Sequence, residues 1–413
     1  MKPFSALPLI LMAGLLSFYS CQKKNPIKID RTDFETNDDS TTKAWTYLFY
    51  DNADFEQAYD PMYDFVHFAF SGQQINTLIL RDRENRPAAY YRVTEDHTAE
   101  MLKELGEVNM GDAQTLADFL QFSKELYPAK RTILAFYGHG NGWGGCCNDD
   151  TDNDYLSMDD IQNALMQVGG VDVVLFTAPC LMGSVEAVYE LRDCCDLYVG
   201  SEDLSGFVYW YPILSNLFSL LKNSPNIDIY SLGHCLVDLI KQSDLDPSDY
   251  QWLCMSALRT DRIVALKTAI DEVSLTGIEN NPTLSSLMGS NSHDPFFFST
   301  QHADLISLME TWSENDSTII PLTKTVQKAL DSCIVASCFG VNNQQARGLN
   351  IYFPNAQTSS YRTVYGDTEY GLDFSADTHW DDLLRLLWGT AKALPGPASS
   401  GGWPPLREDF HRR

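Results

Sequence analysis

Two reactive side chains follow two apolar runs that are typical of buried strands. Cys180 comes shortly after the run 171–176, and His139 lies among glycines directly after the run 132–137. A cysteine thiolate attacks carbonyl carbons, and a neighbouring imidazole can accept the thiol proton and later return it to a leaving group. These residue types indicate nucleophilic catalysis if the fold brings them together. The alternative is a buried thiol and a histidine that only caps a turn.

The elements that must position these residues alternate between strand-like and helix-like patterns. Strands are predicted at 45–50, 75–80, 88–93, 132–137, 171–176, 197–200 and 349–354. Helices are predicted at 115–126, at 158–166 with Ser157 as the cap, and over most of 227–341. This alternation predicts an α/β fold with a mainly parallel sheet. Ligands of such sheets bind at the carboxyl ends of the strands, so His139 and Cys180 would share one rim if their strands are neighbours.

Seven segments in order resemble the clostripain family of cysteine peptidases. They are WTYLFYDNADFE, ELGEVNMGDAQTLADFL, FYGHGNGW, CLMGSVEAVYEL, VGSEDLSGFVYWY, GLNIYFP and DFSADTHWDDLLRLL. The resemblance implies a caspase-like fold, which is a three-layer α/β sandwich with a mainly parallel central sheet flanked by helices. It also implies a cysteine endopeptidase that acts on protein or peptide substrates.

The resemblance assigns roles to matching residues. His139 resembles the catalytic histidine and Cys180 the nucleophile, and the backbone N–H groups of Gly140 and Cys180 would form the oxyanion hole. Two alternatives remain open: a surface binding protein that keeps the fold but cleaves nothing, and a transpeptidase in which an amine replaces water.

The sequence departs from the family in the region that would select a basic side chain. Members commonly carry an aspartate two residues before the cysteine, where this chain has Ala178. Glu202 or Asp203 could supply the missing carboxylate, so a preference for Arg or Lys stays open. The interval 140–179 contains neither Lys nor Arg. Self-cleavage there with trypsin-like specificity is therefore not expected.

Both ends of the chain are predicted to lie outside the folded domain. Residues 1–21 form an apolar signal that resembles a lipoprotein signal ending at Cys21, with ordinary secretion as the alternative. We expect a flexible tether at 22–43, the peptidase domain at 44–390 and a disordered tail at 391–413. The protein would then be exported, and it would contact a membrane only through the lipid on Cys21.

Composition narrows the partners of this 413-residue chain. Its net charge of −27 argues against nucleic acid as a partner, because phosphate binding needs a basic surface. A monomer without a cofactor is expected, with calcium left open. The alternating Asp150, Asp152 and Asp154 resemble an oxygen-rich calcium loop, but the EF-hand spacing fails, and a solvated acidic loop is the alternative. No residue is predicted as a metal ligand, and the ten cysteines define no disulfide framework.

Overall fold

The structure is a computed structural model. It describes residues 42–54, 61–206, 209–243, 246, 250–284, 287, 301–354, 365 and 372–389. The predicted signal, nearly all of the tether and the tail lie outside these residues. Within the described part of the chain, no helix combines the length and apolarity that crossing a membrane requires.

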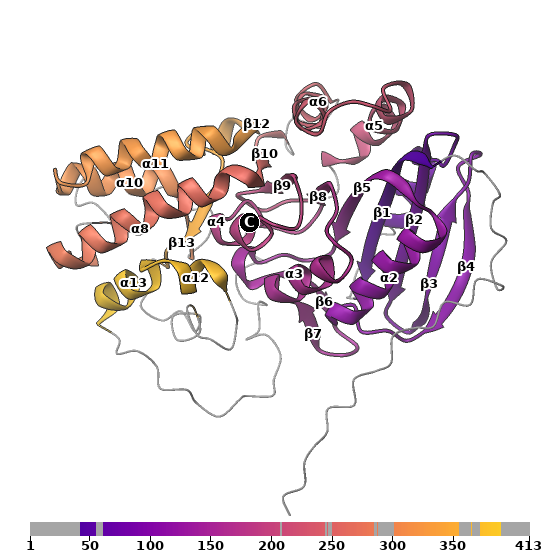
Figure 1. Cartoon of the computed structure of the whole chain (residues 1–413), viewed down its shortest axis with the longest axis horizontal. Helices are drawn as coiled ribbons and strands as arrows, with labels where there is room; N and C mark the ends of the chain where they lie inside the picture. The colour runs from indigo at the N-terminus through magenta and orange to yellow at the C-terminus, as the bar shows by residue number, and fades with distance from the viewer. Residues whose placement is uncertain are drawn as a thin grey trace, which may run out of the picture.

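A nine-stranded sheet forms the centre of the molecule (Figure 1). Its strands, in spatial order, are β12 (Ile334–Phe339), β10 (Cys254–Arg259), β9 (Leu197–Ser201), β8 (Val173–Phe176), β5 (Ala129–Tyr137), β1 (Lys43–Ala53), β2 (Ile75–Arg83), β3 (Arg86–Val93) and β4 (Ala99–Gly106). The five strands from β9 to β2 are parallel, and the two strands at each edge are antiparallel. The predicted mainly parallel sheet is confirmed.

Helices cover both faces of this sheet. One face carries α1 (Pro61–Phe68), α5 (Tyr211–Asn223) and α6 (Ile229–Lys241), and the other carries α2 (Ala113–Leu126), α3 (Met158–Gln167) and α4 (Val185–Glu190). Strand β1 shows why two cores form: its side chains alternate between the faces, so Leu48 and Tyr50 enter one core while Tyr47 and Phe49 enter the other. The predicted three-layer sandwich is confirmed.

A group of C-terminal helices packs beside the β12 end of the sheet, on the left of Figure 1. It contains α8 (Ile263–Asn280), α10 (Leu305–Asn315), α11 (Ile320–Cys333), α12 (Asp373–Asp377) and α13 (Trp380–Trp388). Two short strands, β11 (His302–Asp304) and β13 (Asn350–Tyr352), pair antiparallel within it. The N–H of Asn350 donates to the carbonyl of Gly183 at 2.8 Å, so β13 is attached to the loop that follows Cys180.

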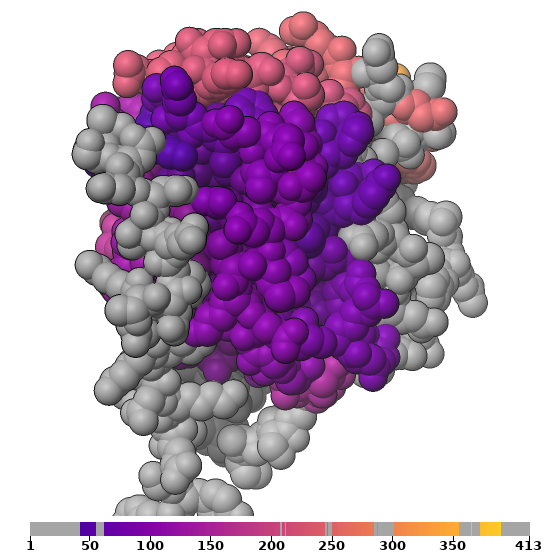
Figure 2. All heavy atoms as spheres, turned by 90° about the vertical axis from the view of Figure 1, so that its right-hand side faces the viewer, coloured from indigo at the N-terminus to yellow at the C-terminus, as the bar shows by residue number. Residues whose placement is uncertain are grey.

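Six of the described strands were not expected from the sequence: β4, β6 (Cys146–Asp149), β7 (Asp154–Leu156), β10, β11 and β12. The region 227–341 is mostly helical, as predicted, but it also contains β10 and β12, which extend the sheet. Strand β4 lies at the opposite edge, where Figure 2 shows the N-terminal part of the chain, in indigo to purple, across the middle of the face. A small hairpin of β6 and β7 follows the His139 loop.

Candidate active site

The strands that precede His139 and Cys180 are direct neighbours. Strands β5 and β8 run parallel, with Phe136 opposite Phe176 at their carboxyl ends. The Thr177 N–H donates to the Phe136 carbonyl at 3.1 Å, and its hydroxyl donates to the same oxygen at 2.6 Å. Both loops therefore leave the same rim of the sheet.

The two loops touch at Gly140. A Cβ atom built on this glycine would lie 2.6 Å from the backbone N and O of Cys180 and 2.6 Å from the Cβ of Pro179. Real Cβ atoms do not approach other atoms so closely, and only glycine permits this contact between backbones. The residue after the histidine is thus packed directly on the cysteine.

Backbone hydrogen bonds hold the His139 loop in shape. Cys147 donates its N–H to the His139 carbonyl at 2.9 Å, and Asn141 donates to Gly145 at 2.9 Å. Gly145 has a φ of +99°, and a Cβ there would lie 2.0 Å from the Leu156 carbonyl oxygen. The glycine-rich composition of this segment allows the tight return toward β6.

The turn after Cys180 is also constrained. Leu181 adopts a φ of +63°, which is uncommon for a residue with a side chain, and its N–H donates to the Asp203 carbonyl at 3.0 Å. Ser184 caps helix α4, which begins at Val185. A turn therefore separates Cys180 from helix α4.

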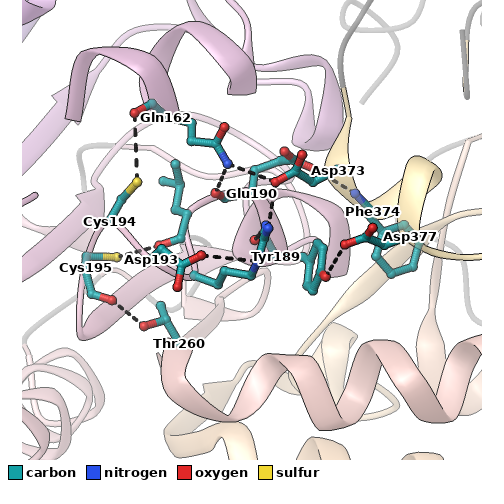
Figure 3. A network of polar contacts seen from close by, with 12 residues as sticks. Gln162, Tyr189, Glu190, Asp193, Cys194, Cys195, Thr260, Asp373, Phe374 and Asp377 are labelled. Carbon is teal, nitrogen blue, oxygen red and sulfur yellow. Dashed lines mark hydrogen bonds and ion pairs between the residues drawn. The ribbon is translucent and has the colours of Figure 1, made fainter. Parts of the chain in front are cut away.

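The far end of α4 is fixed by polar contacts with distant segments (Figure 3). Tyr189 donates its hydroxyl to Asp377 at 2.6 Å, and the Glu190 carboxylate accepts the N–H of Phe374 at 3.0 Å. Gln162 of α3 donates to the Glu190 carbonyl at 2.7 Å. Helices α3 and α12 thus hold the short helix that carries the Cys180 turn.

The Cys180 sulfur is bonded to the loop that follows β9. The Ser205 N–H donates to the Cys180 sulfur at 3.2 Å, and the Cys180 thiol donates to the Ser205 carbonyl oxygen at 3.5 Å. Burial raises the pKa of the thiol to about 11, the Ser205 N–H opposes this shift, and the charge of Asp203 adds to it. In this arrangement Cys180 is a protonated thiol at neutral pH.

His139 lies in the loop that leaves the same rim. Its side chain is exposed at the surface, yet the surrounding protein still desolvates the ring and lowers its pKa. The charge of Asp150 acts in the opposite direction and favours the protonated ring. The lowered pKa favours the neutral imidazole, which can accept a proton.

Replacing Asp150 by Asn is expected to lower the His139 pKa further, because it removes the charge that favours imidazolium. The acid limb of the pH profile of kcat/KM would then move to lower pH, and the variant would keep a larger share of its maximal activity near pH 5. Profiles of both proteins on one peptide measure this shift. A limb that moves to higher pH would contradict the assignment of this limb to His139.

The three residues considered for substrate binding lie in different settings. Ala178 is partly exposed beside Cys180. Glu202 is fully buried, and its carboxylate accepts the Gly348 N–H at 2.7 Å and the Cys254 thiol at 3.6 Å. Asp203 is 5% exposed and accepts the Asn343 side-chain amide at 3.0 Å. Glu202 thus faces the interior, while Asp203 lies close enough to influence the thiol.

Asn350 is a positioning residue that the sequence analysis did not single out. Its side-chain amide donates to the carbonyls of Leu181 at 3.3 Å and Glu202 at 2.8 Å, and so joins the Cys180 turn to the loop after β9. It lies within GLNIYFP, one of the segments that carry the family resemblance, but no pattern in the sequence reveals its partners.

The described cysteines are all free thiols, including the adjacent pairs at 146–147 and 194–195. Cys254, Cys333 and Cys338 are buried in the core, and Cys235 is partly exposed.

Comparisons with known proteins show similarity over most of the chain. The model of the Clostripain family matches residues 47–388. Clostripain of Hathewaya histolytica is 24% identical in an alignment of 333 positions, which covers 64% of this chain and 60% of that relative's length. A secreted C11 cysteine protease from Bacteroides thetaiotaomicron, solved with an irreversible peptide inhibitor, has a TM-score of 0.59 and 17% identity over 82% of this chain and 99% of its own.

An inactive zymogen C11 protease from Parabacteroides distasonis has a TM-score of 0.60 and 16% identity over 82% of this chain and 99% of its own. These structures share the fold, and the family model spans both reactive loops. The chain therefore belongs to the clostripain family.

Proposed function

We propose that the protein is a cysteine endopeptidase that cleaves peptide bonds with Cys180 and His139. The observation that supports this proposal is the contact of the two loops at Gly140, because these loops carry Cys180 and His139 and follow neighbouring parallel strands. Membership of the clostripain family supports the same chemistry.

The reaction begins when the neutral His139 ring accepts the Cys180 proton. The sulfur attacks the substrate carbonyl, and a C–S bond forms as the carbonyl oxygen becomes an oxyanion. The C–N bond then breaks, and the imidazolium gives its proton to the leaving amine. Water attacks the acyl-enzyme with His139 as the base, which releases the acid and restores the thiol.

The backbone N–H groups of Gly140 and Cys180 are available for the oxyanion. Within the described part of the chain, neither group donates to a protein acceptor. Two preorganised N–H donors at an oxyanion stabilise the transition state by several kcal/mol, about 3 kcal/mol for a single donor. Because these N–H groups have no acceptor among the described residues, they favour oxyanion binding over a purely structural role.

The contact between Cys180 and Ser205 corresponds to a resting form of the site, in which the thiol keeps its proton. The high thiol pKa and the two contacts of the sulfur with Ser205 disfavour the thiolate. A substrate that occupies the space beside Cys180 would have to displace this segment. The absence of Lys and Arg in 140–179 favours an enzyme that works without trypsin-like self-cleavage in that interval.

Cleavage of a mixed-sequence peptide library by the intact protein, with a Cys180→Ala variant beside it, tests the proposal. Cuts by the native protein alone would support it, and product masses with an added amine separate hydrolysis from transpeptidation. If neither protein cleaves the library, even after limited proteolysis, the result would contradict the peptidase proposal and favour a binding protein without catalytic activity.

Replacing Asp203 by Asn tests whether this carboxylate selects a basic side chain. If it does, kcat/KM for peptides with Arg before the cut would fall by about 10-fold or more, since a charge-assisted hydrogen bond contributes about 1.5–3 kcal/mol. Matched peptides with Leu at that position would not lose activity, because the variant also removes a charge that opposes the thiolate. Equal losses on both peptides would argue against this role.

We further propose that the protein is exported and anchored by a lipid on Cys21, with 1–21 as the signal. The apolar run that ends at Cys21 supports this proposal. Palmitate labelling of cells that express the native chain or Cys21→Ala should label only the native chain. Equal labelling of the native chain and Cys21→Ala would contradict the lipid anchor and support ordinary secretion.

A further inference from the structure

Four carboxylates from distant parts of the sequence meet at one end of the sheet. Asp54 follows β1, Asp82 lies in β2, Glu107 follows β4, and Asp149 ends β6. Each offers an oxygen, and these oxygens all lie within 4.8 Å of one another. Asp54, Asp82 and Asp149 are almost fully buried, and Glu107 is exposed.

Backbone N–H groups orient the three buried carboxylates. Asp149 accepts from Met110 and Asp152, each at 2.8 Å, so its two oxygens are held by different segments. Asp54 accepts from Thr151 at 3.0 Å, and Asp82 accepts from Arg83 at 2.9 Å.

Two buried oxygens of the cluster have no hydrogen-bond partner. They are Oδ1 of Asp54 and Oδ2 of Asp82, in side chains that are 0% and 1% exposed. Within the described residues, no Lys or Arg forms an ion pair with any of the four carboxylates. Unpaired buried carboxylate oxygens are unfavourable unless a cation or a proton balances them.

We propose that Asp54, Asp82, Glu107 and Asp149 bind a calcium ion. All the donors are carboxylate oxygens, which hard cations prefer, and the set contains no His or Cys that would favour zinc. Four carboxylates suit calcium, which takes 6 to 8 oxygen ligands, better than magnesium, which keeps several waters and binds one or two carboxylates. The exposed Glu107 leaves one side of the cluster open for entry and for water ligands.

The proposed ion would connect the sheet to the His139 loop. Asp149 lies two residues after Cys147, whose N–H donates to the His139 carbonyl, and Asp150 donates its N–H to the Asp54 carbonyl at 3.0 Å. A cation between Asp54 and Asp149 would therefore hold β6 against β1 and stabilise that loop. This consequence rests on the proposed peptidase function, whereas calcium binding itself does not.

The acidic loop considered in the sequence analysis is a different set of residues. Asp150 and Asp152 are exposed, and Asp154 accepts the Asn109 side-chain amide at 2.7 Å. Asp152 therefore provides a matched control, because it is an acidic residue of the same loop that contributes only its backbone N–H to the cluster.

Calorimetric titration with CaCl2 of the purified chain carrying Cys180→Ala tests the proposal without relying on activity. We expect one calcium per chain and a higher Tm in its presence. Asp82→Asn and Glu107→Gln should each weaken calcium binding by about 10-fold or more, whereas Asp152→Asn should stay within about threefold. Glu107→Gln keeps the test valid if Asp82→Asn does not fold, because Glu107 is exposed.

Three results would overturn the proposal. The first is that the protein binds no calcium at millimolar concentration and Asp82→Asn has a higher Tm than the protein with Asp82. This result would identify a carboxylate cluster that shares protons and binds no cation. A loss in Asp152→Asn as large as in Glu107→Gln would assign calcium to the exposed loop. Tighter binding of MgCl2 than of CaCl2 would overturn the choice of ion. Peptide cleavage, measured separately on the chain with native Cys180, decides the proposed function independently.

Discussion

Replacement of His139 by Ala is expected to lower kcat/KM by on the order of 10³- to 10⁴-fold on any peptide that the native protein cuts. The physical reason is the state of the thiol. With a pKa of about 11, Cys180 presents very little thiolate at neutral pH and needs a base at the rim to give up its proton. His139 is also the acid that protonates the leaving amine, so its loss affects two steps.

The measurement is kcat/KM of purified variants between pH 6 and 10. His139→Ala should regain activity as the pH rises, because hydroxide progressively replaces the missing base in forming the thiolate. His234→Ala is the matched control, since that histidine is exposed on α6 at a distance in sequence from both loops, and it should retain native activity. An unchanged rate in His139→Ala at pH 7 would exclude it as the base.

The central part of the fold was predictable from local patterns. The strands that become β1, β2, β5 and β8 are apolar runs bounded by polar or glycine-rich segments, and their burial on both faces explains that composition. Ser157 forms a capping box with Asp160, so the start of α3 was encoded within four residues. The candidate site residues His139 and Cys180 were predicted from the same patterns, because each lies a few residues after a predicted strand.

The edge strands could not be read in the same way. Strand β4 has the sequence AEMLKELG, which is rich in residues that favour helices, and its side chains are mostly half-buried or exposed. Only its pairing with β3 makes it a strand. Strands β10 and β12 are short and border long helices, since β10 comes shortly before α8 and β12 directly follows α11. Apolar runs of this length fit either structure.

The surroundings of the site depend on contacts between residues far apart in the sequence. Glu202 and Asp203 are adjacent acids with the same local pattern, yet one is buried against Gly348 and the other lies near the thiol. The carboxylate cluster joins Asp54 to Asp149 across 95 positions of the chain. No spacing rule links such residues, and only the packing of β1, β2 and β6 brings them together.

Gly140→Ala is expected to lower kcat/KM by about 100-fold or more, even though it adds a single methyl group and removes no catalytic side chain. The added Cβ would lie 2.6 Å from the backbone N and O of Cys180, and neither atom can rotate away. The two loops must separate, and a shift of about 1 Å in the positions of reacting groups can reduce the rate by about 100-fold. The same shift would move the N–H groups that are proposed to bind the oxyanion.

Gly72→Ala is the matched control, because a Cβ at that position meets only ordinary contacts, with the Phe70 ring at 3.7 Å and a Glu95 carboxylate oxygen at 3.9 Å. The experiment compares kcat/KM, Tm and the rate of Cys180 alkylation for both variants. We expect Gly140→Ala to stay folded, because the clash is local to loops at the rim while both cores are unchanged. Its thiol should still react with iodoacetamide while peptide cleavage is lost, which would separate misplacement of the oxyanion donors from loss of the nucleophile. Native activity in a folded Gly140→Ala would mean that the close contact between the two loops is not needed for catalysis.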